Sequence, residues 1–586
     1  MSNGADQSRA APGLQFVGNT CVRGLLAILA FCQAGYSQQA ASNIQQPPPV
    51  IAAQPPAGAQ IPVNAFSQPN EIRSVGGVLN VTLNLAVAPN TIAGRVLETA
   101  NYNGLIPGPT LRVHPGDVLK IRLINNLTLT GAPPPTQQVV DCGNRPSHMF
   151  HSPFGPLDPM TFLHTNLHVH GLQVSPRNNG DNVLIDLAPG ETCDYSIPIP
   201  LGPNILPGCP GPYCTPQPAG LFWYHPHRHE ATSKQSWAGL AGAIIVEGEI
   251  DRVPEVAAAR ERLMVLQELW VDTKGRVPSG MVLPIAGSTG SQAVVGTEVP
   301  FTPNPVIPTN IYYTVNGVFQ PEIPIQPGET QRWRILNASP HRVYQLFLEG
   351  NPEIYKIAQD GIAFAQSVKA DNTEKNPSCW ASGNLCLAPG NRVEVIVKFP
   401  ETADQKQRPR LWAVAFDQGH PGGALPKVAL ATLVFAGPAV TGRKIPGKLI
   451  TPPPNVTEPC QGGKTVTFGP GNILTGPVAF PINGKLFTTD MTPMTGKIDT
   501  CEEWTLINAD VFMHPFHIHV NPFQVTEVNG VAVKDIVWWD TAMLPPNGKL
   551  KIKTRYRKDV TGLTVFHCHF LPHEDNGMMT LFELVR

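Results

Sequence analysis

The chain has 586 residues with a formal net charge of −1, and 15% of its residues are charged. A nearly neutral net charge and the absence of stretches rich in Lys or Arg argue against nucleic-acid binding. Its 63 Pro and 53 Gly residues indicate a turn-rich β protein and exclude a mainly helical one. The length fits about three domains of roughly 150 residues each. After the N-terminal region, no apolar run approaches the ~20 residues that cross a membrane, so we expect no membrane span.

The N-terminal region has the pattern of an export signal followed by a linker. Arg23 precedes the apolar stretch 24–31, and small residues follow it, as in a secretory signal peptide. Residues 45–62 are rich in Pro, Ala and Gln, a composition typical of flexible linkers. We therefore expect a leader and linker over residues 1–68, and an extracytoplasmic location, either periplasmic or secreted.

One strand-like segment occurs three times in the chain. Residues 115–125 alternate apolar and polar side chains, and the pattern returns at 327–337 and, more weakly, at 500–508. An Asn-Gly pair, which signals a tight β-turn, precedes each copy, at 103–104, 316–317 and 483–484. Three copies of one β unit predict three related Greek-key β-sandwiches. The predicted domains cover residues 69–249, 250–437 and 438–586.

Two short histidine motifs follow the first repeat. They are His168-Val169-His170 and His225-Pro226-His227. Histidines at positions i and i+2 of a strand project from the same face, so each motif presents two imidazoles together. Neutral imidazole is a good ligand for copper.

Two further motifs follow the third repeat. One contains His514, His517 and His519, and the other contains His567, Cys568, His569 and His573, with Met578 downstream. A thiolate, imidazoles and a thioether at this spacing are the components of a blue-copper site. On a strand, Cys568 points away from the side of His567 and His569, so one short segment would connect two kinds of copper site.

The second repeat is followed by His341 and His420 but by no paired histidines. We therefore expect the second domain to be a copper-free spacer. Because the paired histidines divide between the first and third domains, a cluster built from them would lie in the interface of those two domains.

Eight cysteines lie outside both the leader and the copper motif, an even number that favours disulfides. Their pairing stays open, because eight cysteines allow many connectivities. Cys209 and Cys214, like Cys379 and Cys386, are close enough to close small loops. Disulfides agree with an oxidising, extracytoplasmic compartment.

From about residue 70 to the C-terminus, the chain resembles the multicopper oxidase family in its three-domain, laccase-like bacterial form, because the four motifs occur in the family's order. The resemblance implies cupredoxin-like domains and four copper ions. It implies a type 1 copper held by His514, Cys568 and His573, with Met578 as axial ligand. It implies a type 2 copper held by His168 and His517. The type 3 pair would be held by His170, His225 and His569 on one ion and by His227, His519 and His567 on the other.

The resemblance also implies a reaction, in which a donor is oxidised at the type 1 copper and dioxygen is reduced to water at the other three. Glu574, directly after His573, matches an acidic residue that supplies protons in relatives. Asp181 is the candidate for a second one, at a longer spacing than usual from the first motif.

The expected donors are small aromatic molecules, namely phenols and aromatic amines, because the chain has only 11 Met and lacks the Met-rich insertion of relatives that oxidise cuprous ions. Cuprous ions, manganous ions and bilirubin are alternative donors. A copper carrier without turnover would need only the type 1 ligands. A copper nitrite reductase usually has two such domains and one mononuclear catalytic copper. The oligomeric state stays open.

Overall fold

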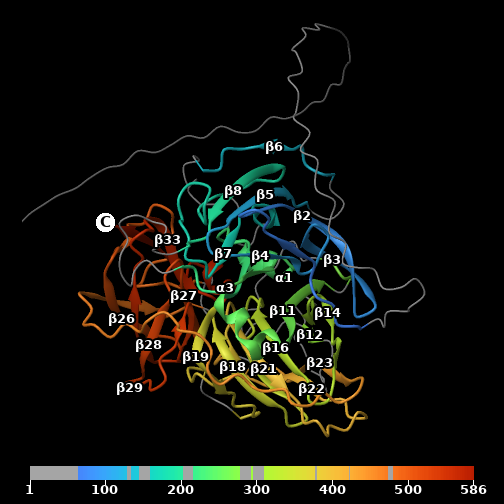
Figure 1. Cartoon of the computed structure of the whole chain (residues 1–586). Coiled ribbons are helices and arrows are strands. Elements are labelled where there is room, and N and C mark those ends of the chain that lie inside the picture. Colours follow the sequence, from blue (N-terminus) through green and yellow to red (C-terminus); the bar gives the residue numbers. More distant parts are fainter. Residues whose placement is uncertain are drawn as a thin grey trace, which may run out of the picture. The chain divides into compact units, whose positions relative to one another are not determined.

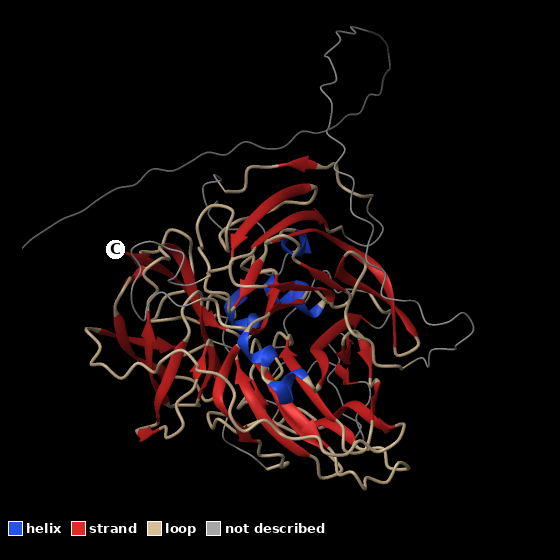
Figure 2. Cartoon of the chain, viewed as in Figure 1, coloured by secondary structure: helices blue, strands red, loops and turns tan. Residues whose placement is uncertain are grey.

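The computed structural model describes residues 64–128, 133–143, 159–201, 216–272, 274–276, 292–294, 309–375, 379–420, 423–472 and 479–586. Strands dominate this part of the chain, and its helices are short (Figure 2). The strands form six sheets, which pair into three two-sheet sandwiches, so the predicted all-β architecture is confirmed. No helix in these ranges combines the length and the apolar character that a membrane crossing requires.

The first sandwich consists of two five-stranded sheets. One has the order β1 (Glu71–Arg73), β4 (Gly108–Val113), β10 (Gly242–Val246), β9 (Gly220–His225) and β7 (His168–His170). The other has the order β3 (Arg95–Tyr102), β2 (Val78–Ile92), β5 (Val118–Asn126), β8 (Glu191–Pro198) and β6 (Gln138–Val139). The two sheets enclose a common core that includes Leu83, Ile121 and Ile244.

The second sandwich pairs an eight-stranded sheet with a five-stranded one. The larger sheet has the order β12 (Gln292–Val294), β13 (Thr309–Val315), β11 (Arg260–Asp272), β16 (Thr330–Asn337), β21 (Arg392–Lys398), β18 (Glu353–Gln359) and β19 (Ile362–Lys369), with β14 (Val318–Phe319) beside β13. The smaller sheet has the order β15 (Glu322–Ile325), β23 (Val428–Phe435), β22 (Arg410–Ala413), β17 (Tyr344–Leu348) and β20 (Cys386–Leu387). Leu266, Ile335 and Leu433 belong to their shared core.

The third sandwich carries two of the four histidine motifs. One sheet has the order β24 (Gly463–Phe468), β26 (Cys501–Asn508), β32 (Lys549–Arg555), β28 (Phe523–Val528) and β29 (Val531–Ala532), with β30 (Trp538–Trp539) beside β28. The other has the order β25 (Met494–Lys497), β34 (Met579–Val585), β33 (Gly562–Cys568), β27 (His514–Ile518) and β31 (Thr541–Leu544). Figure 1 shows these strands at the orange and red end of the colour scale. Trp504, Phe516 and Phe566 are in their core.

The helices of the described ranges are single turns or little more. They are η1 (Pro159–Leu163), α1 (Thr232–Trp237), η2 (Glu249–Arg252), α2 (Pro254–Ala257) and α3 (Leu571–Asp575). The carboxylate of Asp575 in α3 accepts hydrogen bonds from the backbone N–H groups of Thr232 and Ser233 in α1, at 3.2 and 2.8 Å. These bonds tie the loop after β9 in the first domain to the segment after β33 in the third.

The repeated segment occupies the same place in each sandwich. β5, β16 and β26 each pair in parallel with an earlier strand of their own domain, which is β2, β11 or β24. Each also pairs antiparallel with a later strand, which is β8, β21 or β32. Along β5, Leu119, Ile121 and Leu123 are buried while Lys120 and Arg122 are exposed, as the two-residue period of a strand requires. The three repeats are therefore three copies of one β unit, as predicted.

The three Asn-Gly pairs form the tight turns that the sequence predicted. The φ angles of Asn103, Asn316 and Asn483 are 57°, 54° and 51°, and the glycine that follows each has a φ between 72° and 77°. Positive φ at both central residues is the type I′ geometry that only Asn, Asp and Gly adopt readily. Each Asn side chain also accepts a hydrogen bond of 2.8 Å from a backbone N–H, of Asn84, Val265 or Thr467. Each turn thus binds the strand that pairs in parallel with the repeat, which is β2, β11 or β24.

Each repeat ends near a buried asparagine that closes two loops. In each case the asparagine Nδ2 donates to two backbone carbonyls at 2.7–3.0 Å. Asn125 binds those of Leu163 and Leu187, Asn337 those of Arg342 and Leu387, and Asn508 those of Phe512 and Pro545. One primary amide has two N–H donors, so it satisfies two carbonyls at once. In the third sandwich, these bonds fix the segment that leads into His514.

Three disulfides occur within the described ranges: Cys142–Cys193, Cys379–Cys386 and Cys460–Cys501. The predicted small loop between Cys379 and Cys386 is confirmed. Cys209 and Cys214 lie outside the described residues, as do residues 1–63 of the predicted leader and linker. Cys568 is free and buried, so it is available to a metal.

Two segments lie against the second sandwich although the sequence assigned them elsewhere. Ala65, within the predicted linker, forms a β-bridge with Glu322 of β15. Lys448, within the predicted third domain, forms a bridge with Gln366 of β19, and the N–H of Leu449 donates to the carbonyl of Ala365 at 2.9 Å. Contacts of the second sandwich therefore extend beyond residues 250–437 at both ends.

Candidate metal centres

Cys568, His514 and His573 bring three ligand atoms together inside the third sandwich. Cys568 ends β33, His514 begins β27, and His573 lies in α3. The Sγ atom of Cys568 lies 3.4 Å from His514 Nδ1 and 3.7 Å from His573 Nδ1, and the two nitrogens are 3.2 Å apart. All three side chains are buried. Three donor atoms this close together form a ligand set for one ion, which we call the thiolate site.

Neighbouring groups orient the thiolate site. His514 Nε2 lies 2.9 Å from Oδ2 of Asp510, and because a carboxylate only accepts, His514 carries its proton on Nε2 and turns the Nδ1 lone pair to the sulfur. The Phe480 ring stacks on His573, with 3.9 Å between centroids. Burial raises the pKa of the Cys568 thiol well above its ordinary value, so the thiolate form requires a cation beside it.

Met578, the predicted axial ligand, is fully buried next to this set. The N–H of Cys568 donates to the carbonyl of Met578, and the N–H of Met578 donates to the carbonyl of His573, both at 3.0 Å. These bonds fix the Met578 backbone beside two members of the thiolate site. Its role as axial ligand stays a prediction.

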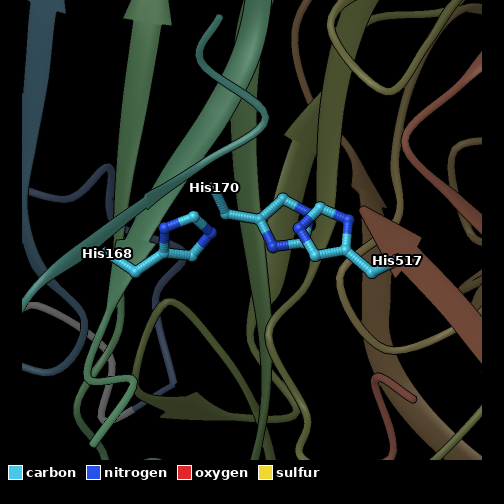
Figure 3. Close-up of side chains that lie close together, drawn as sticks. All are labelled: His168, His170 and His517. Carbon is cyan, nitrogen blue, oxygen red and sulfur yellow. The ribbon is translucent and has the colours of Figure 1, made fainter. Parts of the chain in front are cut away.

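The other eight motif histidines form one buried cluster between two strand pairs. β7 pairs with β9 and places His168 opposite His225, while β27 pairs with β33 and places His517 opposite His567. The two strand pairs belong to different sandwiches. The rings of His170 and His517, one from each sandwich, stack with centroids 3.9 Å apart (Figure 3). The structure therefore brings together all eight residues, which we call the histidine cluster.

The histidine cluster contains three groups, two of which share His170, and the ligand atoms of each group lie within 4.8 Å of one another. The groups are His168, His170 and His517; His170, His225 and His569; and His227, His519 and His567. The last two are the sets that the resemblance implied for the type 3 ions, and the first contains the implied type 2 pair. The shortest approaches are 3.0 Å between His227 Nε2 and His567 Nε2, and 3.2 Å between His569 Nε2 and His170 Nδ1.

Several nitrogens of the histidine cluster have no protein partner. The Nε2 atoms of His168, His225 and His517 are buried and lack a hydrogen-bond partner in the part of the chain that the structure describes. Burial lowers the pKa of each of these rings, so they are neutral and each retains a nitrogen lone pair. Converging buried lone pairs are unfavourable unless cations lie between them. The residues thus fit copper, for which imidazole is a suitable donor.

Both predicted acidic residues lie beside the histidine cluster. Asp181 Oδ1 is 2.9 Å from His168 Nδ1 and accepts the backbone N–H of Val169 at 2.9 Å. Burial raises the pKa of Asp181 to about 8, against this backbone hydrogen bond. Glu574 Oε1 lies 3.9 Å from His227 Nδ1 and 3.7 Å from His229 Nδ1, and burial raises the pKa of Glu574 well above its ordinary value. Despite its longer spacing in the sequence, Asp181 reaches its motif.

The second sandwich also contacts the histidine cluster, which the expectation of a spacer missed. The Arg392 guanidinium at the start of β21 binds the carboxylate of Asp540, and Asp540 in turn contacts His170 and His517. Asp540 and Asp510 were also not found in the sequence. Arg392 opens β21, a strand that also contains Glu394 and Lys398, and no motif in the sequence distinguished it from them.

Two histidines of the second domain lie beside the thiolate site. The ring centroid of His420 is 5.3 Å from that of His573, and that of His341 is 4.9 Å from that of His420. These residues lack the paired spacing of a ligand motif, yet they form part of the wall around His573.

The sandwich fold is cupredoxin-like, and the two ligand sets have the donor atoms that copper prefers. Residues 457–585 match the family model of multicopper oxidases. The chain is 24% identical over 502 residues to the multicopper oxidase mco of Staphylococcus aureus, covering 84% of this chain and 85% of that protein. It is 25% identical to a laccase of Bacillus subtilis, covering 82% and 89% of the two chains. The C-terminal part of the chain thus matches the multicopper oxidase family, and most of its length is similar to multicopper oxidases and laccases.

Solved structures share the fold. A multicopper oxidase from Campylobacter jejuni, described as a metallo-oxidase, superposes with a TM-score of 0.64 at 21% identity, covering 89% of this chain and 95% of that one. The likeness extends over all three sandwiches and is not confined to the C-terminal part that matches the family model.

Proposed function

We propose that the protein couples one-electron oxidation of phenols or aromatic amines at the thiolate site to the reduction of dioxygen to water at the histidine cluster. The observation that carries this proposal is the convergence of eight buried histidines from two sandwiches beside the free Cys568. A copper carrier would use the thiolate site alone and would leave the histidine cluster without a purpose.

Copper would be held as the resemblance implies, with one ion at the thiolate site and three in the histidine cluster. Bound copper would supply the one-electron chemistry that connects the donor at the thiolate site with dioxygen at the histidine cluster. The protein contributes the positions of the ligands, the hydrogen bonds that orient them and a buried, water-poor site.

Three consecutive residues connect the two sites covalently. Cys568 belongs to the thiolate site, while its neighbours His567 and His569 belong to two different groups of the histidine cluster. His567 Nδ1 also donates to the carbonyl of Cys568 at 2.9 Å, which holds its ring against the same peptide. Electrons that enter at the sulfur thus have a short bonded route to either group.

The positions of Glu574 and Asp181 support a role for both in supplying the protons that dioxygen reduction consumes. Both lie at the edge of the histidine cluster, and burial raises the pKa of both. A carboxyl with a raised pKa holds a proton near neutral pH and gives it up when a basic oxygen species forms nearby. We propose that they supply protons to the reaction.

Organic donors are favoured over cuprous ions by the environment of the methionines. The sulfur of Met491 accepts a hydrogen bond from Thr580, and that of Met494 from Asn483, so these two side chains are engaged locally.

The three disulfides favour the extracytoplasmic location that the sequence suggested.

A donor screen on copper-loaded protein tests this function. Oxygen uptake and the blue absorption band are measured with a phenol, an aromatic amine, bilirubin, and cuprous and manganous salts. We expect oxygen uptake with the phenol and the amine, at four electrons per dioxygen. Uptake with only the metal salts would indicate a metal-ion oxidase, and blue colour without any uptake would indicate a carrier.

The substitution Glu574→Gln tests the proton role. We expect steady-state oxygen uptake to fall at least about tenfold, because a positioned acid contributes roughly 10²- to 10⁴-fold in many enzymes. Anaerobic bleaching of the blue band by the donor should keep its rate, since the thiolate site is untouched. Equal losses in both measurements would contradict the assignment.

A further inference from the structure

Asp540 contacts two histidines from different sandwiches through opposite nitrogens. Its side-chain Oδ1 lies 3.3 Å from His170 Nε2, and its backbone carbonyl lies 2.7 Å from His517 Nδ1. A carboxylate and a carbonyl can only accept, so His170 carries its proton on Nε2 and His517 on Nδ1. The lone pairs that remain for metal are therefore on His170 Nδ1 and on His517 Nε2. The latter is the nitrogen that lacks a partner in the described structure.

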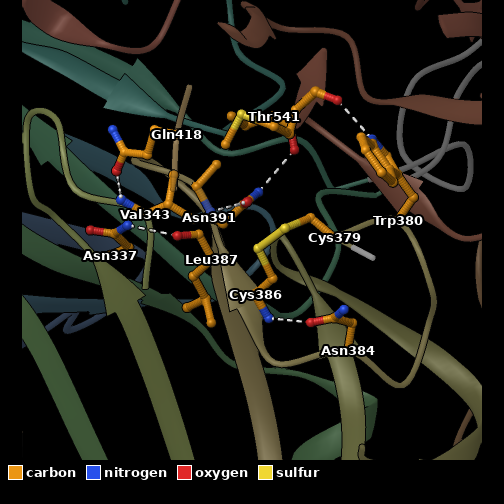
Figure 4. Close-up of a disulfide and its surroundings, with 12 residues drawn as sticks. Asn337, Val343, Cys379, Trp380, Asn384, Cys386, Leu387, Asn391, Gln418 and Thr541 are labelled. Atoms are coloured by element: carbon orange, nitrogen blue, oxygen red, sulfur yellow. Dashed lines mark hydrogen bonds between the residues drawn. A yellow bond between two sulfur atoms is a disulfide. The ribbon is translucent and has the colours of Figure 1, made fainter. Parts of the chain in front are cut away.

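The second sandwich holds Asp540 in place from several directions. The Arg392 guanidinium donates to Asp540 Oδ1 at 2.8 Å and to Oδ2 at 2.6 Å. The Asp540 and Thr541 backbone N–H groups donate to Asp360 at 3.2 and 3.4 Å. Asn391 Nδ2 donates to the carbonyl of Thr541 at 2.9 Å, which Figure 4 shows beside the disulfide of Cys379 and Cys386.

Arg392 touches all three sandwiches. Its Nε donates to the carbonyl of Leu221 in β9 of the first sandwich at 3.0 Å, and Nη1 donates to Gly390 of its own sandwich at 2.9 Å. Arg392 and Asp360 are almost completely buried. Such a network needs the planar fork of an arginine, which binds both carboxylate oxygens as a lysine cannot.

Gly390 shows independently how closely the second sandwich approaches the ligands. Its φ is +89°, and a Cβ atom there would lie 3.0 Å from both His170 Cε1 and His569 Nε2. Only glycine combines this conformation with this clearance.

We propose that Arg392 and Asp360 of the second domain are positioning residues of the histidine cluster. Acting through Asp540, they hold His170 with Nδ1 and His517 with Nε2 toward the metal. Occupancy of the implied type 2 site, which has only His168 and His517 as protein ligands, then depends on the second domain. The inference rests on the proposed copper sites but not on any particular donor.

The test compares Arg392→Lys with Arg332→Lys in the copper-loaded full chain. Arg332, in β16 of the same sheet, is a matched control: it is 3% exposed and binds the carboxylates of Glu394 in β21 and Asp251 in η2, and within the described residues it contacts no cluster histidine. Copper per chain, the type 2 electron paramagnetic resonance signal and the blue band are measured during titration with a chelator.

We expect Arg392→Lys to release type 2 copper at about 10- to 100-fold lower chelator concentration than wild type, with the blue band retained. Arg332→Lys should behave like wild type. Equal copper retention in both variants would overturn the proposal. If Arg392→Lys also loses the blue band, the same titration is carried out with Asp540→Asn. An unchanged type 2 signal in the Asp540→Asn variant would overturn the proposal. Oxygen uptake of the wild type tests the proposed function separately, because copper retention is measured without any donor.

Discussion

At the scale of the residue, one hydrogen bond decides which nitrogen a histidine offers to metal. Asp510 occupies Nε2 of His514, and Asp181 occupies Nδ1 of His168, so the first ring is left with Nδ1 and the second with Nε2. The carbonyl of Pro226, 2.8 Å from His225 Nδ1, likewise leaves Nε2 free. The neighbours of the ligands thus determine the tautomers that make the ligand sets possible.

The substitution Cys568→Ser should separate the two sites. A serine hydroxyl is a much poorer copper ligand than a thiolate, so we expect loss of the blue band and of donor oxidation. The histidine cluster should still bind about three copper ions per chain, because none of its ligands changes. Metal analysis with absorption spectroscopy measures both effects, and a blue band that survives in the serine variant would contradict the assignment of Cys568.

Glu268, a buried residue of β11, gives a pH dependence that is unrelated to copper. Burial raises the pKa of its carboxyl to about 7, against a hydrogen bond from Trp270 and the charge of Arg342. In the unfolded chain the pKa is about 4.3. The folded protein binds the Glu268 proton more tightly than the unfolded chain does, and this contribution to the free energy of unfolding is complete below about pH 4. It is lost as the pH rises through about 7, because the buried carboxyl must then become charged.

Glu268→Gln should remove this dependence. Relative to the variant, the wild type should lose roughly 3 kcal/mol of unfolding free energy between pH 4.5 and pH 7.5, at about 1.4 kcal/mol per pKa unit. Urea unfolding of both proteins across this range measures the difference. A free-energy difference that stays constant with pH would show that Glu268 does not titrate in this range.

At the scale of the element, the same β unit serves a different purpose in each domain. The asparagine that ends each repeat binds two loop carbonyls in the same way in all three sandwiches. In the third sandwich those carbonyls belong to Phe512, just before His514, and to Pro545, just after β31. A structural bond that the first two domains use for packing therefore supports the thiolate site in the third.

Asn508→Ala should affect stability and colour together, whereas Asn125→Ala should affect stability alone. Each change leaves two buried carbonyls without a donor, which costs about 2–6 kcal/mol at roughly 1–3 kcal/mol for each group. The loop that carries His514 moves only in the Asn508 variant, so only that variant should shift the blue band. Denaturant unfolding and absorption spectra of both variants measure this, and an equal spectral shift in both would contradict it.

The sequence predicted those parts of the sites that depend on short spacings. Alternation along a strand was enough to place His168 with His170, and His567 with His569, because their geometry is local. Asp540 and Arg392 were not predictable in this way. They meet across 148 residues and only through the packing of separate sandwiches, and neither belongs to a repeated or spaced motif. For the same reason the sequence did not show that the second domain reaches the ligands.

At the scale of the whole molecule, metal binding should link the domains thermodynamically. The histidine cluster draws ligands from the first and third sandwiches, and an ion bound between them stabilises only the assembled state. A ligand present at 100 times its Kd stabilises the folded state by about 2.7 kcal/mol.

Removal of copper with a chelator should therefore lower the Tm by several degrees, and added copper should restore it. Calorimetry of the loaded and copper-free protein measures the shift. A chain with Cys568→Ser, which still fills the histidine cluster, should retain most of the stabilisation. If the Tm of the copper-free wild type equals that of the loaded protein, metal does not bridge the domains.

The single free thiol of the described ranges has a consequence for biosynthesis. Cys568 must stay reduced while six other cysteines of these ranges become oxidised in the same polypeptide. Once the third sandwich closes, its sulfur is shielded from both oxidants and other thiols. We therefore expect the third sandwich to close before Cys568 can exchange with other thiols, and copper to bind a thiol that is already buried. A newly made chain without copper is then expected to remain a folded apoprotein with its native disulfides formed and Cys568 reduced.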